Sequence, residues 1–256
     1  MKKSSNYSRI SKVMAVATLL AMVACESPTT NESNLEAEPT SQLPEPLVEP
    51  VLTQAERDAL SPESIYQSFK DGNQRFVNNE LTVRSHSNRV RETATGQFPK
   101  AVVISCLDSR VPVEDVLDRG LGDIFVGRVA GNFVNTDLLG SMEFACKVAG
   151  AKVILILGHK HCGAVQSAID DVQLGNITAM LANIKPAVEM TTSSEGADRA
   201  ASNADFVYEV AKNNVRYNMD LIRERSPILK EMEDNREIKI VGGYYDITDG
   251  LIQFIE

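Results

Sequence analysis

The sequence predicts an α/β fold, in which helices flank a mainly parallel central β-sheet. Three nearly continuous apolar runs, at 101–105, 123–130 and 152–158, are typical of strands that helices cover on both faces. Segments with helical spacing alternate with these runs, and this alternation is the pattern of parallel sheets. The closing segment 237–255 adds two further strands around a turn at Asp249-Gly250.

The helices are predicted from capping residues and from apolar spacing. Ser61-Pro62-Glu63 combines an N-cap, a first-turn proline and an early acid, so a helix is expected to begin there and to run to residue 79. A second helix is expected over 136–150, where Gly150 closes the pattern. Further helices are expected over 164–172, 177–190 and 204–226, with Pro186 bending or interrupting the middle one.

Residues 1–24 have the pattern of a secretory signal peptide. A basic start is followed by about a dozen apolar residues, fewer than the roughly 20 that a membrane-spanning helix needs. Met22-Val23-Ala24-Cys25 resembles the lipobox of bacterial lipoproteins, with Met22 where Leu, Val or Ile is usual. The resemblance implies lipidation of Cys25 and an exported protein on the periplasmic side, anchored to a bacterial membrane by its acyl chains. The alternative is plain secretion, with Cys25 lost or left free.

Residues 25–52 are predicted to form a disordered tether. They are acidic and rich in proline, and they contain no lysine or arginine. Such a composition cannot bury enough apolar surface to offset the entropy that is lost on ordering. The remaining residues, 53–256, are enough for a single catalytic domain with a substantial core.

The charge and the cysteine content argue against a nucleic-acid-binding protein and against a disulfide-stabilised one. The chain has a formal net charge of −9, and an acidic domain without basic clusters argues against nucleic-acid binding. The domain holds three cysteines, Cys106, Cys146 and Cys162, an odd number that fits a disulfide framework poorly. Thiols in an oxidising compartment therefore indicate metal binding or burial. Cys146 lies within a helical pattern and is expected in the core.

Reactive side chains follow two of the predicted strands at the points where they end. Cys106, Asp108 and Arg110 come directly after the first strand, and His159 and Cys162 follow the third. The carboxyl ends of parallel strands form one edge of a sheet, where ligands gather. Two thiolates and an imidazole suit Zn²⁺, and three protein ligands leave a fourth position open for chemistry. A catalytic zinc site is therefore predicted at this edge.

These residues also carry a family resemblance. Cys-x-Asp-x-Arg at 106–110, followed by His-x-x-Cys-Gly at 159–163, resembles the β-class carbonic anhydrases. The likeness extends through 96–99, 122–132 and 158–188, and so covers most of the domain. The resemblance implies one Zn²⁺ per subunit, and it assigns the metal ligands Cys106, His159 and Cys162.

The implied activity is the reversible hydration of CO₂ to bicarbonate and a proton by zinc-bound hydroxide. In the family, Asp108 would accept a hydrogen bond from the hydroxide and orient it. Arg110 would keep that carboxylate ionised and correctly turned, through a bidentate pair. The resemblance places four more residues at the substrate: Gln97, Phe125, Phe144 and Gly163. Because the family takes Gln97 and the apolar wall from a neighbouring subunit, a homodimer or tetramer with the site at the subunit interface is expected.

The state of Asp108 distinguishes two branches of the family. In one branch this Asp becomes a fourth zinc ligand and closes the site, together with a bicarbonate pocket that needs a Trp where this chain has Val103. Gln97 and Phe125 match the always-open branch, whereas Phe144 stands where that branch has Tyr. An open site is therefore expected.

Three alternatives stay open. A hydrolase of COS or CS₂ on the same fold would reuse the metal and the Asp–Arg pair. A non-enzymatic zinc-binding lipoprotein is disfavoured, because a structural zinc normally has four committed ligands. His161 is either a proton relay or an exposed turn residue, and Lys160 is expected to be solvated.

Overall fold

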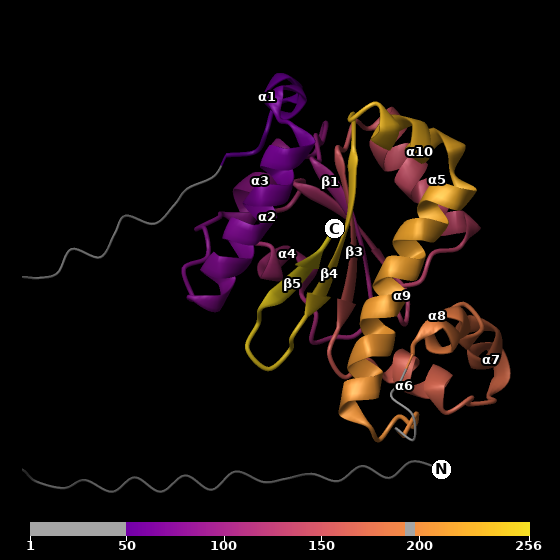
Figure 1. Ribbon diagram of the computed structural model, residues 1–256. Helices are drawn as coiled ribbons and strands as arrows, with labels where there is room; N and C mark the ends of the chain where they lie inside the picture. Colours follow the sequence, from indigo (N-terminus) through magenta and orange to yellow (C-terminus); the bar gives the residue numbers. More distant parts are fainter. Residues whose placement is uncertain (1–49, 193–197) are drawn as a thin grey trace, which may run out of the picture. The chain divides into compact units, whose positions relative to one another are not determined.

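The computed structural model describes residues 50–192 and 198–256. A five-stranded sheet in the order β2-β1-β3-β4-β5 runs through these residues (Figure 1). The first four strands are parallel and the last is antiparallel to its neighbour. The strands are β1 (Ala101–Ser105), β2 (Ile124–Arg128), β3 (Val153–His159), β4 (Lys239–Tyr245) and β5 (Ile252–Ile255). The α/β class and the mainly parallel sheet are thus confirmed.

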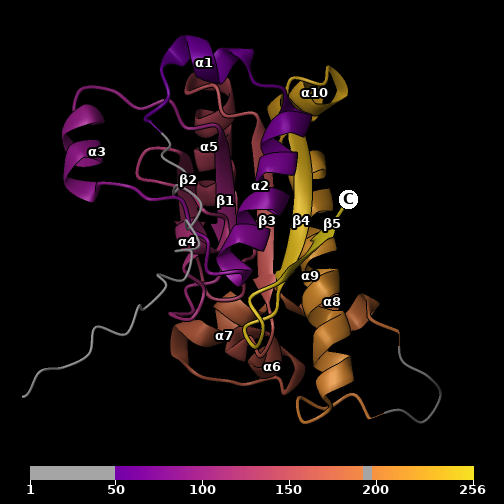
Figure 2. The same cartoon turned by 90° about the vertical axis from the view of Figure 1, so that its left-hand side faces the viewer.

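One face of the sheet packs against α2 (Pro62–Val77) and α4 (Val113–Val116). Side chains alternate along each strand, so Val103, Leu155 and Val241 point to this face and contact the layer that contains Phe69. Burying each such side chain contributes about 1.5–3 kcal/mol. Two shorter helices, α1 (Gln54–Ala59) and α3 (His86–Glu92), precede and follow α2 in the chain, and Figure 2 shows α3 apart from α2 on the side of β2.

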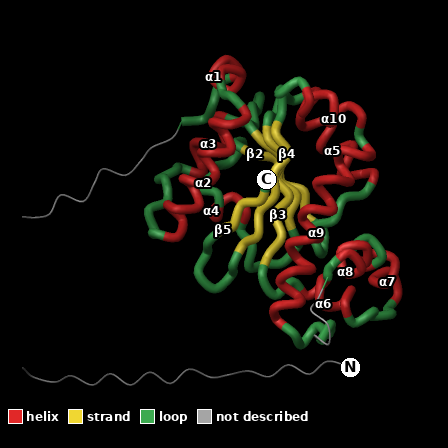
Figure 3. The backbone as a smooth tube through the Cα atoms, viewed as in Figure 1, coloured by secondary structure: helices red, strands yellow, loops and turns green. Residues whose placement is uncertain are grey.

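The opposite face packs against α5, a π-helical turn, α9 and α10. Here the alternate strand residues Ile104, Ile156 and Ile240 are buried with Val215 and Met219 of α9. The sheet therefore lies between two helical layers, as Figure 3 shows by the yellow strands between red helices. These elements are α5 (Thr136–Glu143), the π-helical turn Phe144–Val148, α9 (Ala204–Arg225) and α10 (Pro227–Asp234).

A third apolar cluster lies beyond the carboxyl ends of β1 and β3. It is formed by α6 (Gly163–Ile169), α7 (Gly175–Leu181) and α8 (Lys185–Met190), together with the first turns of α9 (Figure 1). Both Cys106 and Cys162 belong to this cluster. The helical cluster thus shields the edge of the sheet where the predicted zinc ligands lie.

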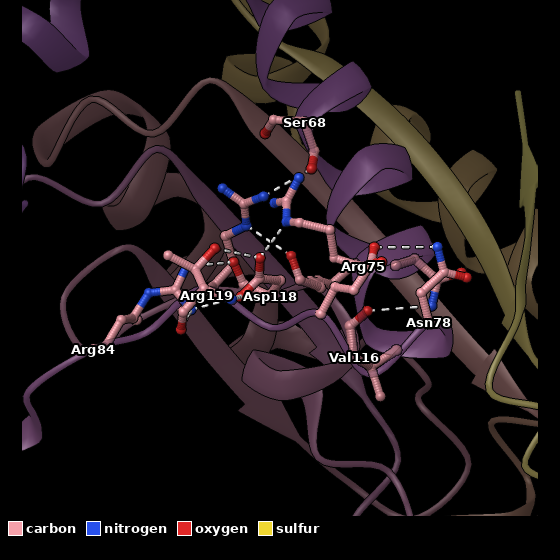
Figure 4. Close-up of polar contacts among 12 residues, drawn as sticks. Ser68, Arg75, Asn78, Arg84, Val116, Asp118 and Arg119 are labelled. Atoms are coloured by element: carbon pink, nitrogen blue, oxygen red, sulfur yellow. Dashed lines mark hydrogen bonds and ion pairs between the residues drawn. The ribbon is translucent and has the colours of Figure 1, made fainter. Parts of the chain in front are cut away.

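A buried carboxylate connects the N-terminal layer to the turn after α4 (Figure 4). Asp118 accepts hydrogen bonds at 2.6 Å from Arg75 and at 2.6 Å from Arg84. Thr82 adds bonds from its hydroxyl at 2.7 Å and from its backbone N–H at 3.1 Å. Burial alone would raise the pKa of Asp118, but the bonds from Arg84, Thr82 and Arg75 outweigh it and lower the pKa to about 2.

Most predicted elements are confirmed, with boundary shifts of a few residues. Ser61 caps α2 and accepts a hydrogen bond from the N–H of Ser64. The segment 177–190 is interrupted, because α7 ends at Leu181 and Pro186 lies in the first turn of α8. The segment 136–150 divides into α5 and the π-helical turn before Gly150, which has a φ of +80°.

The run 123–130 is less deeply buried than the other two, because β2 is an edge strand whose residues are half-buried or exposed. Its side chains still reach both layers, since Phe125 packs on one face of the sheet and Ile124 and Val126 pack on the other. The predicted signal peptide, Cys25 and nearly all of the tether 25–52 lie outside the described residues. Within 50–192 and 198–256, no helix is both long and apolar enough to cross a membrane.

Candidate metal centre

The three predicted ligands converge at the carboxyl ends of two neighbouring strands. Cys106 follows the last residue of β1, His159 is the last residue of β3, and Cys162 precedes the first turn of α6. The turn between His159 and Cys162 is made by His161, whose φ of +56° is in the left-handed region. The ligand atoms of all three residues lie within 4.8 Å of one another, and all three residues are buried.

The geometry of this cluster fits a tetrahedral zinc ion. The Sγ atoms of Cys106 and Cys162 are 3.9 Å apart, and two sulfurs at the usual Zn–S distance would be about 3.8 Å apart. The Nδ1 of His159 lies 2.9 Å from the carbonyl oxygen of Lys160. Its Nε2 is buried and has no hydrogen-bond partner among the described residues. A ring whose Nδ1–H donates to a carbonyl presents Nε2 as an acceptor, as metal-binding histidines do.

The electrostatics of the two thiols also point to a cation. Hydrogen bonds from the Cys162 thiol and from the backbone N–H of Gly131 lower the pKa of Cys106. The hydrogen bond with Cys106, together with burial, raises the pKa of Cys162. When one of two thiols this close has ionised, its negative charge disfavours ionisation of the other, unless a positive charge lies between them. A divalent cation supplies that charge, because metal binding takes both thiols as thiolates.

Asp108 and Arg110 form a bidentate pair beside the cluster. The guanidinium donates to Asp108 Oδ1 at 3.0 Å and to Oδ2 at 2.7 Å, and the backbone N–H of Arg110 donates to Oδ1 at 2.9 Å. The Arg110 guanidinium therefore holds the pKa of Asp108 well below its usual range. Asp108 Oδ2 lies 3.9 Å from His159 Nε2. The ionised carboxylate thus faces the position where the three ligand atoms converge.

Arg128 also holds the main chain of this site, a role that the sequence analysis did not predict. This last residue of β2 donates to the backbone oxygen of Cys106 at 3.0 Å and to that of Asp108 at 2.6 Å. Its side chain thereby fixes the main chain between a metal ligand and the carboxylate. The role depends on β2 lying beside β1, which the residue types alone do not indicate.

Other predicted site residues lie at or near the cluster. Gly163 begins α6 directly after Cys162, and the space around its Cα is open. His161 is exposed in its turn, and its carbonyl oxygen accepts a hydrogen bond from Arg110 at 3.4 Å. Lys160 is not simply solvated, because its Nζ is 2.8 Å from Asp246 Oδ2.

Cys146 is a core residue, and burial raises the pKa of its thiol to about 12.

The structure does not bring three predicted substrate residues to the cluster within one chain. Phe125 and Phe144 line a cavity of about 610 Å³ between β2 and α5. Gln97 lines a separate cavity of about 400 Å³ beside Gly122. None of the three ligands contributes to either cavity. That a neighbouring subunit supplies these side chains to the cluster stays a prediction.

The protein is similar to known carbonic anhydrases in sequence and in fold. A family model described as carbonic anhydrase matches residues 101–252. Carbonic anhydrase 2 of Mycobacterium tuberculosis is 34% identical over 191 residues, which cover 74% of this chain and 91% of the relative. The β-carbonic anhydrase CafA of Aspergillus fumigatus is 27% identical, with a TM-score of 0.59, over 67% of this chain and 82% of that one.

A more distant solved structure shares the fold. It comes from work on two tetrameric β-carbonic anhydrases of Sordaria macrospora. It is 23% identical, with a TM-score of 0.57, over 74% of this chain and 95% of that one.

Proposed function

The chain belongs to the β-class carbonic anhydrase family, and from this premise we propose how its residues carry out the reaction. The protein is a zinc-dependent lyase that interconverts CO₂ and bicarbonate with release of a proton. One observation carries the assignment of the site. Three buried ligand atoms lie within 4.8 Å of one another, beside a carboxylate that a guanidinium holds at both oxygens.

We propose that Cys106, His159 and Cys162 hold the zinc ion. When bound, zinc supplies a Lewis acid that lowers the pKa of a coordinated water from about 15.7 towards 7. The two thiols contribute negative charge, and His159 binds through Nε2 because its Nδ1 is engaged with the carbonyl of Lys160. The fourth position stays open for the reactants.

Asp108 is proposed to orient the attacking water. Arg110 holds the pKa of this carboxyl below its usual range, so the group is ionised at neutral pH and can only accept hydrogen bonds. Its Oδ2 faces the ligand cluster at 3.9 Å from His159 Nε2. An acceptor at this place fixes the direction of the water's lone pairs and leaves one of them aimed at CO₂.

The intact Asp–Arg pair supports an open site. To bind the metal itself, Asp108 would have to give up a hydrogen bond of 2.7 Å from Arg110 to Oδ2. Charge-assisted bidentate pairs of this kind are among the strong hydrogen bonds of proteins. We therefore propose that Asp108 stays on Arg110 and does not become a fourth ligand at neutral pH.

The substrate pocket is proposed to be completed by a second subunit. Gln97 would hold an oxygen of the substrate, and Phe125 and Phe144 would form the apolar wall. The backbone of Gly163 is a further candidate to hold an oxygen. Phe144 is 56% exposed and lines a cavity with Phe125 and Val126 of the edge strand β2, so this is an exposed apolar surface of the kind that a partner covers. The tetrameric relatives among the solved structures support a homodimer or a tetramer.

We further propose that the protein is exported and anchored to a bacterial membrane through a lipid on Cys25. The support is the basic start, the short apolar run and the small residues that precede this cysteine. Residues 25–52 would then be a tether for the catalytic domain 53–256, and would hold it clear of the lipid.

Substrate assays test the proposed reaction against its rival. The zinc-loaded full chain should hydrate CO₂ faster than it hydrolyses COS or CS₂. A chain that hydrolysed COS or CS₂ but did not accelerate CO₂ hydration would support the hydrolase instead. A chain that bound zinc and turned over none of the three would support a zinc-binding lipoprotein.

A further inference from the structure

A continuous chain of buried hydrogen bonds leads from α9 to one of the predicted zinc ligands. Its last link is the backbone N–H of Gly131, which donates to Cys106 Sγ at 3.3 Å. Gly131 lies in the loop that joins β2 to α5, and no side chain of its own can hold it in place. The position of this donor therefore depends on what holds the loop.

The conformation at Gly131 shows how tightly the loop is packed. Its φ of +83° is in the left-handed region, and a Cβ there would collide with the Ile184 side chain. The next residue, Asn132, also has a positive φ, of 43°, although it is buried. A positive φ is costly for a residue other than glycine, so the conformation of Asn132 persists because its surroundings impose it.

Two asparagines one turn apart on α9 supply that constraint. Asn214 Nδ2 donates to the carbonyl oxygen of Gly131 at 2.8 Å. Asn218 Oδ1 accepts from the backbone N–H of Val134 at 2.7 Å. Both asparagine side chains are completely buried. The loop is thus held at both ends of the segment 131–134.

The direction of each amide is fixed by its neighbours. Asn218 must turn its oxygen towards Val134, which leaves its Nδ2 to donate to Asn214 Oδ1 at 3.2 Å and to the Asn214 carbonyl at 2.7 Å. Asn214 must then direct its own Nδ2 at Gly131. Each link therefore sets the next, up to the sulfur of Cys106.

We propose that Asn214 is a positioning residue for Cys106, acting through the Gly131 N–H, with Asn218 in support. The inference rests on the proposed assignment of Cys106 as a zinc ligand. The N–H···S bond stabilises the thiolate and fixes the direction of its lone pairs. Without Asn214 the loop and its donor shift, and the thiolate loses this hold. Partners in the outer shell of a metal site typically contribute about 10–100-fold to metal affinity.

Zinc affinity of the full chain tests the proposal. Asn214→Ala should raise the Kd for zinc about tenfold, measured by competition with a chromophoric chelator. Asn213→Ala is the matched control, because Asn213 lies on the same helix and its amide donates to Thr191 Oγ1 at 2.9 Å, away from the cluster. The control should keep the Kd of the unchanged chain at a similar loss of thermal stability.

A spectroscopic reading separates positioning from general destabilisation. In cobalt-substituted protein, Asn214→Ala should shift the thiolate-to-metal charge-transfer band, whereas Asn213→Ala should leave it in place. If Asn214→Ala does not fold, Asn218→Ala carries the test, since it removes the amide that orients Asn214 and should shift the band in the same direction.

The outcomes distinguish this inference from the proposed function. An unchanged Kd and an unchanged band in the Asn214 and Asn218 variants would overturn the inference alone. Equal losses of affinity in Asn214→Ala and Asn213→Ala would also overturn it, because the effect would then be structural. An unaltered chain that bound no zinc would overturn the ligand assignment as well.

Discussion

Asp108 has its place in the site because Arg110 engages both oxygens of its carboxylate. An asparagine of nearly the same shape would keep one acceptor, but it would lose the charge and the bidentate geometry. The family resemblance of Cys-x-Asp-x-Arg implies this pair, so the pair could be predicted from the sequence. The distance from Oδ2 to His159 Nε2 could not, because it depends on how β1 and β3 pair.

The first prediction concerns this carboxylate. Asp108→Asn should lower kcat for CO₂ hydration. We expect a decrease on the order of 10²–10⁴-fold, which is what a positioned acid or base contributes. The zinc content should stay at one ion per chain, since the three ligands remain. Asp234→Asn, at an exposed ion pair on α10, is the control and should leave kcat unchanged. Full activity in Asp108→Asn would show that the carboxylate does not orient the reacting water.

Two residues near the metal were not predicted, and the reason is the same for both. Arg128 ends β2, and Asn214 lies in a long helix where a polar residue usually faces solvent. Each acts on Cys106 only through elements that are distant in sequence. The residue types of the ligands indicate zinc, but the groups that hold the ligands follow from the topology.

At the scale of elements, helices with an apolar stripe were predictable and helices held by polar contacts were not. α2 was predicted because of its cap and its apolar spacing. The helix α3 buries only Arg89, which is paired with Asp123 at 2.6 Å, so its sequence has no apolar pattern to detect. α10 was missed because Ser226 both ends α9 and caps the next helix through Leu229.

The buried carboxylate of Asp118 gives a prediction about stability. Removing one partner from a buried ion pair leaves the other charge uncompensated, at a cost of about 3–5 kcal/mol. Asp118→Asn should therefore lower the free energy of unfolding by about that amount at neutral pH, measured by urea denaturation. Asp71→Asn, at an exposed acid on α2, should change it little. A loss as small as that of the control would mean that Asp118 does not hold the N-terminal layer.

The same carboxylate predicts how stability depends on pH. Its pKa in the folded chain is about 2, and that of an unfolded aspartate is about 3.9. A lowered folded pKa stabilises the protein above the unfolded value, and this contribution is lost as pH falls through the folded value. The stability difference between the unaltered chain and Asp118→Asn should thus be constant above about pH 5 and shrink below it.

At the level of the whole molecule, we propose that a second subunit completes the catalytic pocket. Phe125 and Phe144 line a cavity beside the edge strand, away from the zinc ligands. Phe144→Glu should therefore weaken subunit association and lower kcat/KM together. The substituted side chain would no longer form the apolar wall of the partner's substrate pocket. Light scattering and the hydration assay measure the two effects. Leu174→Glu, at a residue that is 62% exposed on another surface, should change neither. A monomeric chain with full activity would contradict this prediction.

The proposed lipid anchor also concerns the whole molecule. Cys25→Ser should release the protein from the membrane fraction into the aqueous phase, because the acyl chains could no longer attach. Detergent phase partition of cells that express the full chain measures this change. The nearby Ser27→Ala should leave the protein with the membranes. Equal partition of Cys25→Ser and the unaltered chain would contradict lipidation at this residue.

We propose that this chain hydrates CO₂ with a zinc ion held by Cys106, His159 and Cys162. The most direct test is stopped-flow CO₂ hydration at mildly alkaline pH, on full chain shown to contain one zinc per subunit. We expect a rate far above that of the buffer, which disappears when the metal is removed and returns when zinc is restored. A zinc-loaded chain with no rate above the buffer would contradict the account.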